Sequence, residues 1–470
     1  MSTTLSPIGQ LVRGLTLVAA VAVIVSNVIG TGVFLKARVM TCNVGSPEMV
    51  TTVWVVAGLL SLAGALTYAE LGAMMPRAGG EVNYLGAAYG ERWGFLYGWM
   101  QLLIGKTGSQ AAVAVAFASA LAGAMGAGWG GPLLTVGGFE LTGLQGVAVA
   151  LIALVTLVNL ASVAASGRIA TVLTAVKVAL VVGVGVAAFT YIDGTWGHFG
   201  TSGAAGACEG VDSAARLGIG GFGAAMLAAL WGYDGWNNMA LVAGEVKDPG
   251  RNIPRGLFLG VGAVLVLYVF VNAAYFFAMS PLEIASIDEG GVVAIEVMRR
   301  VVGPLGVSVM AAGLMASSFG TLHSSMLSGA RIPYRLAEGG LLPRRLATLT
   351  PRTRVPVWSV VAQGAWASVL ALSGSFDTLT DYVIFGSWIF YGLTISAVFV
   401  LRKTMPDAER PYRAWGYPVV PALFLLVTAF LLVNTLITSP VQSLVGLGLI
   451  ALGLPVYAVA VRRRRVAPVA

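Results

Sequence analysis

Long apolar stretches separated by short polar segments occupy most of the chain. Many contain about 20 residues, which is the length that an α-helix needs to cross a bilayer. They predict an all-α membrane protein with about twelve transmembrane helices in a single transmembrane domain, residues 1–470. The predicted spans lie near residues 15–41, 50–75, 92–126, 140–162, 169–192, 216–244, 256–280, 303–330, 356–373, 378–401, 418–437 and 441–461.

Two predicted spans are interrupted near their middle. The first contains Gly30-Thr31-Gly32, and the sixth contains Gly232 and Gly235 on either side of Asp234. A glycine inside a helix costs about 1 kcal/mol, so both spans are expected to break there. Because the breaks lie five spans apart, and an odd number of crossings reverses direction, they indicate a transporter built from inverted repeats. Glycines that only allow close helix packing are the alternative.

The inverted-repeat interpretation divides the domain into three parts. Residues 15–192 form the first repeat, 216–402 the second, and 418–461 two additional helices. A broken helix exposes backbone groups at the membrane midplane, where the N-terminus of a half-helix attracts a carboxylate and free carbonyls attract a cation. A zwitterionic amino acid fits such a site at both of its charged groups.

The composition removes most other protein classes. Hydrophobic residues make up 57% and charged residues 10% of the chain, whereas soluble domains carry about 25% charged residues. The mean hydropathy is +0.85. These values exclude a soluble enzyme, a disordered chain and a nucleic-acid-binding protein, and they make the lipid bilayer the expected environment.

The net charge of +8 is distributed unevenly. If the N-terminus is cytoplasmic, most Lys and Arg residues fall on the inner side, including Arg331, Arg335 and Arg462 to Arg465. This positive-inside bias predicts a multi-pass membrane protein with both termini in the cytoplasm. The first apolar run lacks the features of a cleavable signal peptide. Cys42 and Cys208 both fall outside, where they could pair or remain free thiols.

Several motifs resemble the amino acid–polyamine–organocation superfamily, and in particular the L-type amino acid transporter branch in its bacterial form. They are Ile29–Phe34 (IGTGVF), Tyr68–Gly72 (YAELG), Tyr233–Asn237 (YDGWN) and Gly244–Pro249 (GEVKDP). The resemblance implies a LeuT-type fold. It also implies a secondary transporter of amino acids that works by sodium-independent exchange or facilitated uptake with alternating access.

The resemblance further implies which residues surround the substrate, between broken spans 1 and 6 and neighbouring spans. It places Trp231 as an aromatic gate. The implied substrate-binding residues are Ile29, Gly30, Thr31, Gly32, Ile104, Gly105, Ser109, Trp231, Gly232, Tyr233, Asp234, Asn237, Tyr268, Phe385 and Trp388.

Charged residues inside the predicted spans are functional candidates, because burying them in lipid is costly. By resemblance, Lys177 occupies the place of a sodium ion and ties spans 1, 5 and 8 together; it could instead carry a transported proton. Lys106 and Asp234 could form an ion pair. A free Asp234 would favour a cationic substrate side chain, whereas a neutralised one would favour a neutral or polar side chain, and a purely structural pair is a third possibility.

The remaining candidates concern coupling and gating. Ser318, Glu70 and Glu245 are assigned to these roles by resemblance, and His323 is either a proton carrier or a structural residue. A proton-coupled amino acid symporter is the main alternative function, and a cationic amino acid or polyamine antiporter is a second one. No nucleophile, metal-ligand set or cofactor motif supports an enzyme, so neither cofactor nor metal is expected.

The partner expectations follow from the same comparison. The eukaryotic branch is linked to a glycoprotein heavy chain by a cysteine between spans 3 and 4, and residues 127–140 contain none. We therefore expect no disulfide-linked heavy chain and either a monomer or a homo-oligomer.

Overall fold

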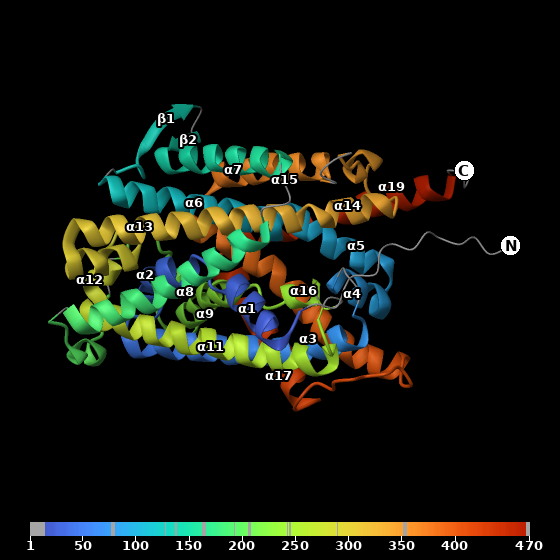
Figure 1. Cartoon of the computed structure of the whole chain (residues 1–470), viewed down its shortest axis with the longest axis horizontal. Coiled ribbons are helices and arrows are strands. Elements are labelled where there is room, and N and C mark those ends of the chain that lie inside the picture. The colour runs from blue at the N-terminus through green and yellow to red at the C-terminus, as the bar shows by residue number, and fades with distance from the viewer. Residues whose placement is uncertain are drawn as a thin grey trace.

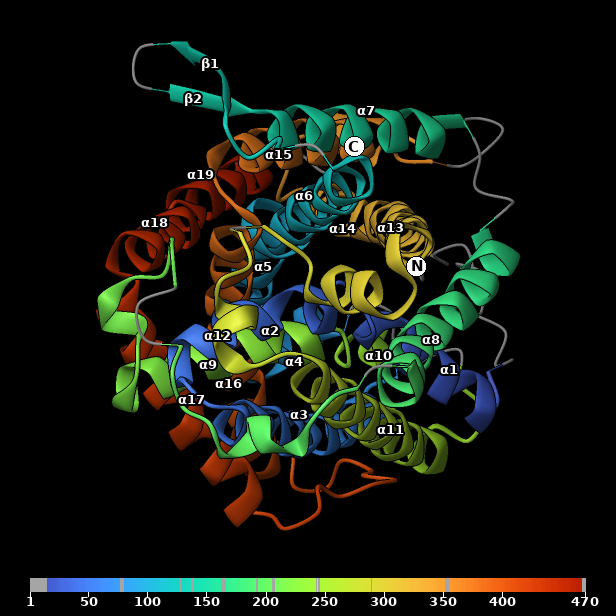
Figure 2. The same ribbon diagram turned by 90° about the vertical axis from the view of Figure 1, so that its left-hand side faces the viewer.

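The computed structural model describes residues 15–76, 80–126, 128–136, 139–161, 166–191, 193–204, 208–241, 243, 246–288, 290–350 and 355–466. The long helices run roughly parallel to one axis of the molecule (Figure 1). A two-stranded antiparallel sheet, β1 (Pro132–Val136) and β2 (Phe139–Thr142), projects from one end of this bundle (Figure 2).

The helices account for the twelve predicted spans. In the described residues, eight helical stretches are long and apolar enough to cross a membrane, and a bent pair of helices adds a ninth. The unbroken stretches are α3 (Pro47–Met74), α5 (Glu91–Met100) with the π-helix η1 (Gln101–Gly105) and α6 (Lys106–Met125), α7 (Gly143–Ala161), α11 (Pro249–Ala278), α13 (Val293–Gly329) with α14 (Arg331–Glu338), α16 (Phe376–Thr404), α17 (Val419–Thr438), and α18 (Pro440–Ala451) with α19 (Gly453–Val466).

Shorter helices supply the rest. The bent pair is α1 (Leu17–Val28) and α2 (Gly32–Val44), and the other three expected spans correspond to α8 (Ser166–Tyr191), α15 (Val357–Ser373), and α9 (Gly218–Tyr233) with α10 (Asn238–Leu241). The connecting elements are α4 (Glu81–Tyr89), α12 (Pro281–Ala285) and the 3₁₀ turns Trp196–Gly200, Ser213–Ala215 and Arg344–Ala347.

The helices bury one face and expose another apolar face. On α17, Phe424 and Leu431 are buried in the bundle, whereas Leu426 and Ile437 are 69% and 68% exposed. Exposing such an apolar outer surface to water is unfavourable, whereas lipid tails solvate it. The molecule is therefore a multi-pass membrane protein.

Helices that lie five spans apart pack directly against each other. The contacting pairs are α2 with α9, α3 with α11, α6 with α13, and α7 with α15. Two inverted repeats related by an axis in the membrane plane produce this pairing, although the repeat boundaries remain predictions.

The two ends of the bundle differ. Helices α14 and α19 lie at one end, called here the α14 end, and α12 lies at the other (Figure 1). At that other end, called the disulfide end, Cys42 of α2 is bonded to Cys208, and both pack with Ala204 and Ala285. The pairing that the sequence left open is therefore present. Because the chain contains 2 cysteines, none is left for a disulfide to another protein.

Candidate functional site

The first break separates α1 from α2, which are bent by 48° relative to each other. Helix α2 begins at Gly32, and its N-cap residue Thr31 makes no side-chain capping bond. The Thr31 hydroxyl is buried and has no hydrogen-bond partner among the residues that the structure describes. The first N–H groups of a helix have no partner within the helix and carry partial positive charge. The start of α2 is therefore equipped to bind an anionic group.

The second break follows α9, which ends at Tyr233. Asp234 has an extended backbone, and Gly235 has a φ of +114°, which L side chains rarely adopt. A Cβ on Gly235 would also lie 2.6 Å from the carbonyl oxygen of Asn27 in α1. Glycine is thus required at this position both by its backbone angle and by the approach of the first break.

The two breaks touch along their backbones. A Cβ on Gly32 would lie 2.8 Å from the Cα of Gly232 and 2.9 Å from the Trp231 ring. The Tyr268 hydroxyl of α11 lies 3.1 Å from the carbonyl oxygen of Val28 and 2.9 Å from that of Gly232. One phenol therefore joins the carbonyl end of the first break to the second.

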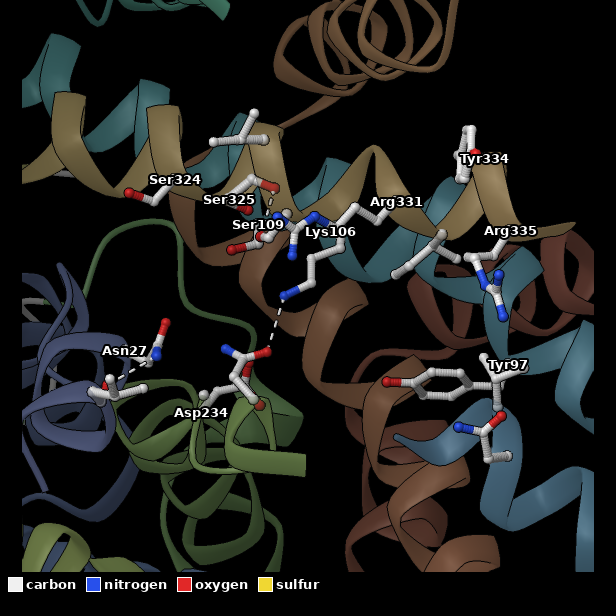
Figure 3. A pocket seen from close by; sticks show the side chains of 18 of the residues that line it. Asn27, Tyr97, Lys106, Ser109, Asp234, Ser324, Ser325, Arg331, Tyr334 and Arg335 are labelled. Carbon is white, nitrogen blue, oxygen red and sulfur yellow. Dashed lines mark hydrogen bonds between the residues drawn. The ribbon is translucent and has the colours of Figure 1, made fainter. Parts of the chain in front are cut away.

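A cavity of about 1500 Å³ lies beside the breaks. It extends to the α14 end, where its lining includes the half-exposed side chains of Glu91 and Arg335. Figure 3 shows this cavity with Asn27, Lys106, Ser109 and Asp234 around it. Of the residues expected at the substrate or in coupling, those that line it are Gly30, Thr31, Gly32, Lys106, Ser109, Lys177, Trp231 and Asp234.

Side chains close the route from this cavity to the disulfide end. The Trp231 ring packs edge-on against Phe376, with ring centroids 6.1 Å apart. Beyond them, Lys36 of α2 is 1% exposed and donates hydrogen bonds to Asp377 Oδ1 and Thr380 Oγ1, both at 2.6 Å. The cavity therefore opens at the α14 end and is sealed at the disulfide end.

Lys177 joins three helices. Its Nζ donates to the Ser26 carbonyl oxygen of α1 at 3.2 Å and to Thr321 Oγ1 of α13 at 2.8 Å. These helices belong to spans 1 and 8, and Lys177 itself lies in span 5. In the described residues no carboxylate lies within 4.0 Å of its ammonium, so only neutral oxygens solvate it.

The direct Lys106–Asp234 ion pair that the sequence suggested is not formed. Lys106 Nζ instead donates to Asn238 Oδ1 at 3.2 Å, and Asp234 Oδ1 accepts a hydrogen bond from the Tyr391 hydroxyl at 2.6 Å. The lysine reaches the residue that begins α10, while the carboxylate turns toward α16.

Other expected substrate residues lie in helix contacts away from the cavity. Trp388 stacks on Phe424 of α17, with centroids 5.1 Å apart, and Phe385 faces Gly446 of α18. Both aromatics therefore support the packing of α16 instead of lining the cavity. Seven other expected substrate residues are also buried or tightly packed and do not line the cavity: Ile29, Ile104, Gly105, Gly232, Tyr233, Asn237 and Tyr268.

The expected gating residues have separate surroundings. Glu70 is 1% exposed and accepts hydrogen bonds from Arg402 at 2.9 and 2.6 Å and from the Ala414 amide at 2.7 Å. Ser318 is buried and its hydroxyl has no partner in the described residues. His323 is also buried, without a partner at Nδ1. Glu245 lies outside the described residues.

Two buried charged residues escaped the sequence reasoning. Glu81 is fully buried at the start of α4 and accepts a hydrogen bond at 2.8 Å from Asn237, which explains why that amide lies away from the cavity. Lys36 lies inside the first predicted span, 15–41, and is buried within α2. For Glu81, the position of a carboxylate beside an apolar run could have indicated a buried charge. For Lys36 the sequence offers no such signal, because its partner Asp377 lies 341 residues away.

Comparisons with known proteins agree with this architecture. The model of the amino acid permease family matches residues 15–461. The serine/threonine exchanger SteT of Bacillus subtilis (strain 168) is 31% identical over 94% of this chain and 95% of its own length. The large neutral amino acids transporter small subunit 2 of Oryctolagus cuniculus is 31% identical over 94% of this chain and 79% of its own. The b(0,+)-type amino acid transporter 1 of Mus musculus is 28% identical over 90% and 82%.

Proposed function

Because the chain belongs to the amino acid permease family, we propose that it is a secondary transporter that exchanges amino acids by alternating access. The observation that carries this proposal is the meeting of two broken helices beside a cavity of about 1500 Å³. The exchangers among its relatives agree with exchange as the transport mode.

The amino acid would be held by both breaks. The N-terminus of α2 and the unpartnered Thr31 hydroxyl would bind the α-carboxylate, because a helix N-terminus favours an anion. The α-ammonium would face backbone carbonyls of the breaks and Asp234, which lines the cavity. Trp231 would separate the bound substrate from the disulfide end.

The membrane orientation belongs to the same proposal. The α14 end would face the cytoplasm of a bacterium, with both termini inside, because α14 and α19 carry the arginine-rich segments. The disulfide at the opposite end agrees with an oxidising exterior. The described conformation would then be open to the inside, and closing of the α14 end would accompany opening of the disulfide end.

Sodium independence is part of the same proposal. The Lys177 ammonium lies between the Ser26 carbonyl and the Thr321 hydroxyl, at the position that the resemblance assigns to a sodium ion in sodium-coupled relatives. Transport should therefore proceed at the same rate when choline replaces sodium.

Counterflow in proteoliposomes tests the proposal. Purified protein is reconstituted, the vesicles are loaded with one amino acid, and uptake of a labelled amino acid is measured across a panel of all twenty. We expect saturable uptake of at least one amino acid, stimulated by internal amino acid. Absence of uptake for the whole panel would refute amino acid transport, and equal uptake into empty vesicles would refute exchange.

A proton-coupled symporter is the second candidate, because Lys177 lines the cavity and has only neutral partners. A symporter would acidify the vesicle interior as substrate enters, whereas an exchanger would not. A pH-sensitive dye trapped inside the same vesicles separates the two mechanisms.

A further inference from the structure

The charged residues of the cavity do not balance. Among the described residues that line it, the cations are Lys106, Lys177, Arg331 and Arg335, and the carboxylates are Glu91 and Asp234. Glu91 is paired with Arg464 and Arg335 with Glu338, each at 2.9 Å. With Lys177 bound to neutral oxygens, Lys106 and Arg331 remain as cations that face the cavity beside one carboxylate.

Lys106 and Arg331 come from neighbouring stretches of two packed helices. A Cβ on Gly329, at the end of α13, would lie 3.4 Å from the Cβ of Lys106, and Arg331 follows two residues later. Figure 3 shows both long side chains extending into the cavity, close to Ser109. The two cations therefore lie on neighbouring parts of one wall of the cavity.

Neither cation is in direct contact with a carboxylate of the described residues, although Lys106 interacts at longer range with Asp234 and Glu81. In the part of the chain that the structure describes, no carboxylate oxygen lies within 4.0 Å of Lys106 or Arg331. Among the described residues the Lys106 ammonium donates to one amide oxygen, that of Asn238, at 3.2 Å, and an ammonium has three donors. The nearby Asp234 carboxylate is engaged by Tyr391 at 2.6 Å. This wall therefore lacks an anion.

We infer that the substrate has an acidic side chain, whose carboxylate binds between Lys106 and Arg331. This inference rests on the proposed function, because the α-groups of the same amino acid would be held at the two breaks. A guanidinium offers paired donors that match a carboxylate, and charge-assisted hydrogen bonds are stronger than neutral ones. The Ser109 hydroxyl, which lines the same wall, adds a further donor.

The arrangement also determines which substrates are rejected. A cationic side chain would meet two like charges at this wall, which discriminates against lysine, arginine and polyamines. A neutral amide of the same shape would leave the two cations without a counter-charge. The transporter should therefore distinguish an acidic side chain from a neutral one even where the two have nearly the same size and shape.

Two substrate pairs isolate that charge. Glutamate and glutamine, and likewise aspartate and asparagine, have almost the same shape and the same α-groups, so the breaks bind both members of a pair alike. In counterflow with wild-type protein, we expect the acidic member of at least one pair to be exchanged at least tenfold faster at subsaturating concentration.

Two variants test whether Lys106 and Arg331 cause the preference for acidic substrates. Lys106→Met keeps nearly the same side-chain length and Arg331→Gln keeps a polar side chain, and both remove the charge. Each should reduce the acid-to-amide ratio toward one. Arg335→Gln is the matched control, because Arg335 lines the outer part of the same cavity but is already paired with Glu338. Its ratio should stay at the wild-type value.

The outcomes separate this inference from the function on which it rests. Exchange of neutral or cationic amino acids without a preference for the acidic member would overturn the inference and leave amino acid exchange intact. No exchange of any amino acid would overturn the proposed function itself. The wild-type ratio decides the inference even if a variant fails to fold, and an unchanged ratio in a folded Lys106→Met protein would also refute it.

Discussion

The seal at the disulfide end depends on one buried lysine, and Lys36→Met should weaken it. The Lys36 ammonium makes two hydrogen bonds of 2.6 Å to α16, one of them to the Asp377 carboxylate. Each hydrogen bond to a charged group contributes about 1.5–3 kcal/mol. Because Asp377 is 31% exposed, water replaces part of this stabilisation, and we take about 2 kcal/mol for both bonds together.

Removing this stabilisation raises the population of molecules that are open at the disulfide end, and this population can be measured. About 2 kcal/mol corresponds to a shift of roughly 30-fold toward conformations that are open at the disulfide end. Val113 lines the cavity beyond the seal, so a cysteine placed there reports access from that side. Since both native cysteines are bonded to each other, a membrane-impermeant maleimide applied to intact cells would label only Val113→Cys.

The expected result is labelling about 30-fold faster in Lys36→Met than in the parent with Lys36 intact. Arg299→Gln is the control, because it removes a pair with Glu296 whose side chains are 49% and 35% exposed. Such exposed pairs contribute less than about 1 kcal/mol, so the labelling rate should rise less than about fivefold. Equal labelling rates for Lys36→Met and the parent would show that the lysine does not hold the seal.

Three further predictions concern other parts of the site. Lys177→Met removes the ammonium that joins α8 to α1 and α13, so initial counterflow rates should fall at least tenfold; an unchanged rate would contradict a coupling role. Gly32→Ala places a Cβ 2.8 Å from the second break and should abolish counterflow, whereas Gly30→Ala, whose nearest atom is 3.9 Å away, should retain most of it. Glu70→Gln breaks a buried ion pair and should lower the free energy of unfolding by about 3–5 kcal/mol. Glu338→Gln, at an exposed pair, should cost less than about 1 kcal/mol; thermal unfolding in detergent measures both.

Sequence reasoning located the broken helices because glycines and a carboxylate in the middle of an apolar span conflict with a continuous helix. It did not give the rotation of α16, since that helix is apolar on most sides and no polar face marks a direction. Phe385 and Trp388 could therefore be assigned to the cavity only by resemblance, whereas packing turns them toward α17 and α18.

Long-range pairing was a second limit. Lys36 and Asp377 are 341 residues apart, and a single sequence provides no signal that joins them. The contact between Lys106 and Asn238 instead of Asp234 depends on where α10 begins, and hydrophobic patterns define helix ends only to within a few residues.

The contact between Gly32 and Gly232 brings the two breaks together backbone to backbone. In the proposed site, main-chain groups of this junction hold the common α-groups together with Thr31 and Asp234, so substitutions in the rest of the cavity leave this part of the site unchanged. Recognition of the common part of an amino acid and recognition of its variable part are then genetically separable. Lineages of such proteins can change their substrate by mutating Lys106, Ser109 or Arg331 one at a time, with every intermediate still able to hold an amino acid.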